Sequence, residues 1–254
     1  MKKNFPENIL ESFIITIVFF GVTGFCIVTF EVIFKSLVYK KILMHFGYVF
    51  GLFITLGFIK MINKQTIKLS PNANFIRFGH FAIVLVLSVF LLNIPIIKLY
   101  ESYMSSEPII AQNPLKSIIY LLAALTIAPI VEEIIFRGII LDGLLNNTKI
   151  YKWKAIIFSA SLFAIIHISP VQVFSAFVIG FVCGAYYSKT RNLFATIILH
   201  SIANLFITIA SYLHYNFGDS NIKTVNDLYG EYSLIILIAC IVLIMVFFMR
   251  RHKT

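Results

Sequence analysis

Charged residues are scarce in this sequence. Only 13% of its 254 residues are Asp, Glu, Lys or Arg, whereas 59% are hydrophobic. This composition lies outside the balance of soluble globular domains, so we expect an integral membrane protein. The chain also lacks a charge run, a low-complexity tract or a Gly/Ser-rich linker long enough to separate two folds. We therefore expect a single membrane domain over residues 1–254.

Cysteine is rare as well. The three cysteines, Cys26, Cys183 and Cys240, lie far apart in apolar runs, which argues against a disulfide framework and against a thiolate metal site. A His-Glu-x-x-His zinc motif is absent. The net charge of +10 comes from basic residues scattered over short segments. Because they do not form one basic stripe with interleaved aromatics, we expect no nucleic-acid partner.

The chain instead contains long apolar runs. A helix needs about 20 apolar residues to cross the hydrocarbon core of a bilayer. Two of the runs are short and are separated only by Ser169-Pro170, so they form either a tight hairpin or a broken, partly re-entrant pair. We predict an all-α, polytopic helical membrane bundle of about eight spans, with seven as the alternative. The candidate spans are 12–34, 42–62, 79–99, 117–145, 155–168, 171–187, 193–213 and 233–249.

The basic residues also predict the orientation of the bundle. With the N-terminus inside, most of them fall in inner segments, so we expect both termini to be cytoplasmic. The abundance of Ile, Lys, Asn and Phe suggests an AT-rich bacterial genome, and hence the bacterial cytoplasmic membrane. Small residues at Gly47-x-x-x-Gly51 and Ala176-x-x-x-Gly180-x-x-x-Gly184 each share one helical face. They predict close packing between neighbouring helices.

Three ionisable residues, Glu132, Glu133 and Arg137, interrupt the apolar run 117–145. Ionisable groups inside a membrane are costly and tend to be functional. Glu133 and Arg137 are four residues apart and share a helical face, so we expect them to pair. Glu132 points roughly 140° away from Arg137 and must find its partner on another helix. An unpaired carboxylate of this kind could act as a general base.

Polar groups also occur in two later spans, namely His167 in one and His200 with Asn204 in the other. His200 and Asn204 are four residues apart, so both can donate hydrogen bonds toward a common point, as an oxyanion hole requires. Glu132 and His167 could then hold and deprotonate a water molecule. Taken singly, an intramembrane His or Asn is more often an interhelical hydrogen-bond partner. Their joint occurrence on three spans favours chemistry.

These motifs, in this order on separate apolar spans, resemble the CPBP intramembrane endopeptidases, a group of CAAX prenyl proteases and bacteriocin-processing or bacteriocin-immunity proteins. The resemblance covers residues 117–210, a family-like catalytic core, whereas residues 1–116 carry no motif and form accessory spans. It implies that Glu132 and His167 activate water. It also implies that His200 and Asn204 stabilise the oxyanion. The matching positions for Glu133 and Arg137 imply a supporting role.

A metal is the main alternative within this chemistry. Glu132, His167 and His200 form a set that could hold zinc with one open position. Since the usual zinc motif is absent and Asn204 is an unsuitable zinc ligand, we favour a mechanism that requires no cofactor.

Three functions compete on the sequence. The first is an intramembrane endopeptidase whose partners are the bilayer and a peptide or membrane-protein substrate. The second is a non-catalytic scaffold or immunity protein that binds a partner within the bilayer. The third is a proton-coupled transporter, since intramembrane carboxylates and histidines can relay protons. The absence of clear internal repeats makes the transporter the least favoured.

Overall fold

All regular elements that the computed structural model describes are helices, which confirms the predicted all-α class for this part of the chain. The structure describes residues 6–34, 40–62, 75–88, 121–147, 150–167 and 170–217. Its elements are α1 (Ile9–Ile33), α2 (Lys40–Ile62), α3 (Phe75–Ser88), η2 (Ala123–Ile127), α7 (Ala128–Glu133), η3 (Ile134–Leu141), α8 (Asp142–Asn147), α9 (Lys152–Ile165), α10 (Pro170–Thr190) and α11 (Leu193–Phe217).

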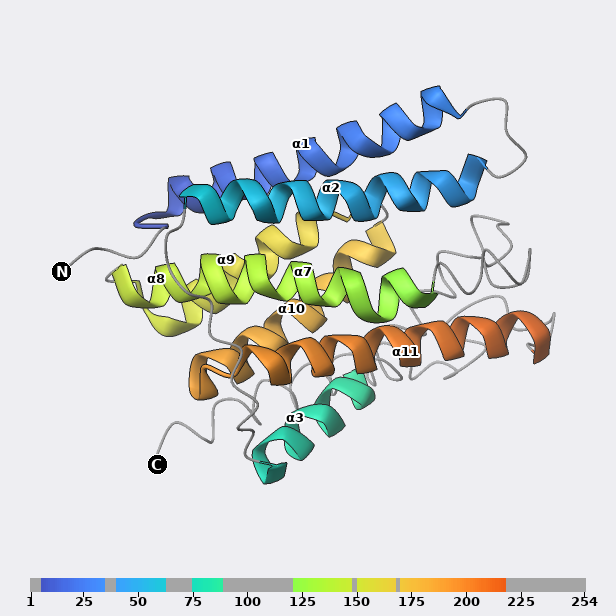
Figure 1. Cartoon of the computed structure of the whole chain (residues 1–254). Helices are drawn as coiled ribbons and strands as arrows, with labels where there is room; N and C mark the ends of the chain where they lie inside the picture. Colours follow the sequence, from blue (N-terminus) through green and yellow to red (C-terminus); the bar gives the residue numbers. More distant parts are fainter. Residues whose placement is uncertain are drawn as a thin grey trace.

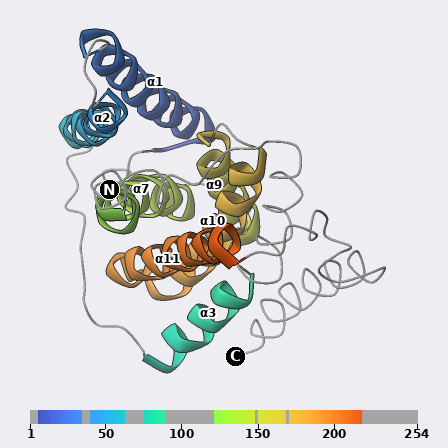
Figure 2. The same cartoon turned by 90° about the vertical axis from the view of Figure 1, so that its right-hand side faces the viewer.

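The helices are stacked in layers around α7. In Figure 1, α1 and α2 lie side by side along one edge, the helix that contains α7 runs beneath them, and α11 follows on its other side. Figure 2 shows α9 and α10 beside this stack, with α3 outermost. Helix α7 contacts both α2 and α11. Side chains from α2 and α11 can therefore reach α7 from opposite directions.

The described helices coincide with seven of the eight predicted spans, and the eighth, 233–249, lies outside the described residues. Among the described residues, two stretches, Ile9–Ile33 and Gln172–Thr190, are long and apolar enough to cross a membrane. Helix α9 has 14 residues and is therefore about 21 Å long, shorter than a bilayer core of about 30 Å. It packs extensively on α10. The number of crossings and the sidedness of the termini stay predictions.

Two wide π-helical turns, η2 and η3, flank the two glutamates without breaking the helix from Ala123 to Asn147. Pro129 explains the first. Its ring lacks an N–H and crowds the preceding turn, so the helix widens there. The Ala128 N–H accordingly bonds to the carbonyl of Ala123, five residues back. Such turns are frequent at functional sites, where they alter which side chains share a face.

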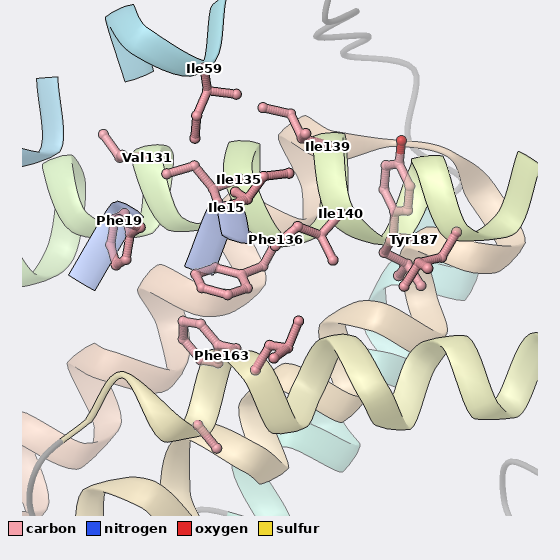
Figure 3. Packing of buried hydrophobic residues seen from close by; sticks show 14 of the residues in the cluster. Ile15, Phe19, Ile59, Val131, Ile135, Phe136, Ile139, Ile140, Phe163 and Tyr187 are labelled. Carbon is pink, nitrogen blue, oxygen red and sulfur yellow. The ribbon is translucent and has the colours of Figure 1, made fainter. Parts of the chain in front are cut away.

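The largest apolar core joins the hairpin α1–α2 to the helices that carry the polar motifs. Figure 3 shows Ile59 of α2 near Ile135 and Ile139 of η3, and Phe136 close to Phe163 of α9. The rings of Phe136 and Phe163 meet edge to face with centroids 5.2 Å apart. Since lipid tails are as apolar as these side chains, the contacts stabilise a membrane bundle through close packing more than through the hydrophobic effect.

The glycine motifs lie at helix contacts, which confirms the predicted close packing. A Cβ atom at Gly47 would stand 2.9 Å from the carbonyl oxygen of Cys26, so no side chain fits between α1 and α2 there. On α10, a Cβ atom at Gly180 would stand 3.2 Å from Cα of Ala160 on α9. The absence of a side chain at these positions lets the backbones approach closely.

Gly51→Ala should destabilise the protein. The added Cβ would stand 2.7 Å from Cα of Thr23, a backbone atom that cannot move aside without shifting α1. We expect the free energy of unfolding to fall by about 1–3 kcal/mol. Denaturation in detergent, followed by the fluorescence of Trp153, measures it. Gly57→Ala on the same helix is the matched control, since a Cβ there meets no atom within 4 Å. An equal loss in both variants would contradict the assigned contact.

Candidate active site

A buried ion pair anchors the site. Nη1 of Arg137 lies 2.8 Å from Oε1 of Glu133, which confirms the predicted pairing of these two residues. Both side chains are fully buried. The guanidinium also stands over the ring of Phe163, 4.7 Å from its centroid, a cation–π contact that partly replaces lost hydration. In the part of the chain that the structure describes, Nε and Nη2 of Arg137 and Oε2 of Glu133 have no hydrogen-bond partner. Each of the two charges is therefore stabilised mainly by the other.

Glu132 finds its partners on two other helices, as its direction away from Arg137 predicted. Its Oε1 accepts a hydrogen bond of 2.7 Å from the hydroxyl of Tyr48 on α2. Its Oε2 lies 3.8 Å from Nε2 of His200 on α11. This separation is too long for a direct hydrogen bond. Both atoms can instead bond to one water oxygen that lies beside the line joining them.

His200 connects the two glutamates. Its Nδ1 lies 3.0 Å from Oε1 of Glu133, so an Nδ1–H group donates to that carboxylate. In the neutral imidazole, Nε2 is then the basic nitrogen, and it is the atom that faces Glu132. The side chain is buried, with 3% of the residue exposed. Hence Glu133 and Arg137 orient His200, and His200 presents Nε2 toward Glu132.

His167 lies beside this group, at the end of α9. Its Nδ1 is 3.0 Å from the carbonyl oxygen of Phe163, and because a carbonyl can only accept, Nδ1 carries the proton. Nε2 is thus again the basic nitrogen. The rings of His167 and His200 both meet the Phe163 ring edge-on, with centroids 5.1 and 5.5 Å from it. His167 also lies within electrostatic range of Glu132 and of His200.

Asn204 makes a contact that the sequence did not predict. Its Nδ2 donates to the carbonyl oxygen of Ala124 in η2, over 2.8 Å. In the π register this carbonyl would accept from residue 129, which is proline and has no N–H. Asn204 supplies the missing donor and ties α11 to η2. The second N–H of its amide is left for another acceptor.

Tyr48 is the site residue that sequence reasoning missed. A tyrosine in a motif-free span carries no local signal of this role. The available signal was periodicity, because Tyr48, Leu52, Thr55 and Ile59 form one stripe on α2. Leu52, Thr55 and Ile59 are all buried in the structure. A polar aromatic residue at the start of a buried stripe requires a partner on a neighbouring helix.

No group of three or more His, Cys, Asp or Glu side chains among the described residues is placed to hold a metal ion. The predicted alternative of zinc on Glu132, His167 and His200 rests on a suitable donor set, since both histidines keep Nε2 open while Nδ1 is bonded. Metal ligands are usually oriented in this way.

A second polar cluster lies around Asp142, at the C-terminal end of the helix that carries the two glutamates. The hydroxyl of Tyr187 donates to Oδ1 of Asp142 over 3.0 Å, and Arg191 forms an ion pair with the same carboxylate. Asn146 donates to Oδ2 of Asp142 over 2.8 Å. Arg191, just after α10, has a φ of 52°, which any residue other than glycine adopts at a cost. These contacts tie α8 to the loop between α10 and α11.

The described residues form a helical fold with a buried glutamate–histidine centre. Residues 114–206 match the family described as type II CAAX prenyl endopeptidase, Rce1-like. The matched segment contains all six motif residues, and it confirms the resemblance to the CPBP family over this segment. Helices α1 and α2, including Tyr48, lie outside it.

A curated relative points the same way. A protein of Bacillus subtilis (strain 168), named "Putative membrane peptidase YdiL", is 31% identical over 83 residues. The alignment covers 33% of this chain and 33% of that protein, so the two share about a third of their lengths. No solved structure matches the chain.

Proposed function

We propose that this protein is an intramembrane endopeptidase that hydrolyses a peptide bond in a membrane-associated peptide or protein. The observation that carries the proposal is the buried gap of 3.8 Å between Oε2 of Glu132 and Nε2 of His200. Tyr48 holds the far oxygen of Glu132, and Glu133 holds the far nitrogen of His200. Glu132, fixed in this way in a low-dielectric site, suits base chemistry on a water molecule, and His200 is fixed close enough to stabilise the charge that develops.

In the proposed reaction, Glu132 takes a proton from water while the water oxygen attacks the carbonyl carbon of the scissile bond. Nε2 of His167 accepts the other hydrogen bond of this water and orients it. His200, when protonated at Nε2, and the second N–H of Asn204 donate to the oxyanion of the tetrahedral intermediate. Collapse of the intermediate breaks the C–N bond, and the proton held by Glu132 passes to the leaving amine.

The substrate class follows from the surroundings of the site. Because Glu132 lies buried among apolar helices, we propose that the scissile bond enters the bundle from the membrane. The matching family is described as a prenyl endopeptidase. The composition of the chain favours a bacterial cytoplasmic membrane, where a peptide precursor or a membrane regulator is a better substrate than a prenylated protein.

Glu132→Gln should abolish processing. The amide keeps the shape of the side chain and its contact with Tyr48 but cannot take a proton from water. We expect the uncleaved precursor to accumulate in membranes of this variant, as measured by comparing its membrane proteome with that of the wild type. Glu11→Gln is the matched control, since Glu11 lies in the first turn of α1 and its carboxylate accepts from the N–H of Glu7. Normal processing by Glu132→Gln at normal expression would refute the assignment.

The same assay distinguishes a metal-free mechanism based on Glu132 from a zinc-dependent one. The glutamate-based mechanism predicts that processing survives a chelator such as 1,10-phenanthroline. Loss of processing with the chelator, and its return on addition of zinc, would assign the metal to Glu132, His167 and His200 instead.

The scaffold function has one observation in its favour. Asn204 bonds across helices to Ala124, and Glu133 bonds to His200, so each polar contact also holds the bundle together. A scaffold predicts that Glu132→Gln lowers stability but preserves the phenotype. The proteome comparison distinguishes this result from loss of cleavage.

A further inference from the structure

The geometry points to Tyr48 as a positioning residue of the active site, which makes the N-terminal hairpin α1–α2 part of the catalytic machinery. This inference rests on the proposed hydrolytic function. Tyr48 lies outside the segment that matches the family, 114–206, and in the part of the chain without motifs. Its role follows from its hydrogen bond of 2.7 Å to Oε1 of Glu132.

The packing of α2 fixes the direction of Tyr48. Leu52 and Ile59 follow it on the same helical face and are buried in the core shared with α7 and η3. On an adjacent face of α2, Gly47 and Gly51 hold the helix against α1. The helix can therefore neither rotate nor retreat without losing one of these contacts. The Tyr48 hydroxyl is delivered to Glu132 by a rigid element.

The hydrogen bond from Tyr48 gives the two oxygens of Glu132 different roles. Oε1 accepts from Tyr48, and Oε2 is left facing Nε2 of His200. Fixing one oxygen of a carboxylate removes most of the rotational freedom of the whole group. The hydrogen bond to Oε1 therefore also keeps Oε2 at the position where the water must be held. The phenol also stabilises the ionised carboxylate, the form that accepts a proton. Tyr48 thus acts through Glu132.

Tyr48→Phe tests this role. The assay uses the purified full-length protein in detergent and a quenched fluorogenic peptide that spans the junction of the precursor found in Glu132→Gln membranes. We expect kcat to fall by about 10- to 100-fold with little change in KM, the range for loss of a hydrogen bond to a charged group. We also expect the acidic limb of the pH–rate profile to move to higher pH, because the ionised form of Glu132 loses a donor.

Tyr187→Phe is the matched control. It removes the same kind of bond, tyrosine to carboxylate, from Asp142 in the second polar cluster. We expect its kcat and its acidic limb to equal those of the wild type. A second variant retains the hydroxyl: 2,3-difluorotyrosine at position 48 is a more acidic donor, and we expect it to move the acidic limb to lower pH.

Three results would overturn the inference. The first is a wild-type kcat and an unmoved acidic limb in Tyr48→Phe. The second is an equal fall in kcat in Tyr48→Phe and Tyr187→Phe, which would indicate general destabilisation. The third is an unmoved limb with difluorotyrosine, which decides the matter even where Tyr48→Phe fails to fold. Full cleavage by Glu132→Gln in the same assay would instead remove the proposed function itself.

Discussion

Arg137→Met is expected to lower the free energy of unfolding by about 3–5 kcal/mol. Methionine fills much of the same volume but leaves the carboxylate of Glu133 buried without its cation. Glu133 is fully buried, and its Oε2 has no hydrogen-bond partner among the described residues, so the lost charge has no substitute there. Denaturation of the purified protein in detergent measures the loss.

A double variant separates the ion pair from simple packing. Glu133→Gln combined with Arg137→Met removes both charges, and the glutamine oxygen can still accept from Nδ1 of His200. Replacing both members of a buried ion pair by uncharged groups changes the free energy of unfolding little. We therefore expect the double variant to regain most of the stability that Arg137→Met loses. A double variant as unstable as Arg137→Met alone would show that the contact with Phe163 matters more than the pair.

His200→Ala is expected to reduce peptide cleavage by about 10²- to 10⁴-fold, since it removes a group that acts in acid–base or oxyanion chemistry. It also leaves Oε2 of Glu132 with no group across the gap of 3.8 Å. The measurement is kcat/KM on the fluorogenic peptide. KM should change little if His200 acts mainly in the transition state.

His80→Ala is the control for this prediction. His80 lies on α3, which packs on α10 and α11 at the outer side of the stack (Figure 2). We expect its activity to match that of the wild type. A His200→Ala protein that is folded and fully active would contradict the assigned role, whereas an equal loss in both variants would indicate damage to the bundle.

The fold was largely predictable because the signal is local. A run of about 20 apolar residues must form a helix in a membrane, since every backbone polar group has to be paired within the segment. Gly47 and Gly51 marked their contact with α1 for a similar reason, because small residues have few other uses in such runs. The π turns were not predictable in this way. Pro129 indicated a disturbed helix but not its form.

The exact hydrogen-bond partners in the site were predictable only where both residues share one helix. Glu133 and Arg137 follow from their spacing of four residues. The bond between Tyr48 and Glu132 joins residues 84 positions apart, and that between Asn204 and Ala124 joins residues 80 positions apart. Contacts of this range depend on how the helices pack. The apolar stripe on α2 indicates that Tyr48 faces a neighbouring helix, but it does not identify the residue that Tyr48 meets there.

The central claim is that Glu132 activates water inside the bundle. The most direct test is to cleave the fluorogenic peptide in H₂¹⁸O and to measure the masses of the products by mass spectrometry. The account predicts one ¹⁸O atom in the new carboxyl terminus with the wild-type protein and no product with purified, folded Glu132→Gln. Labelled product formed at the wild-type rate by Glu132→Gln would contradict it.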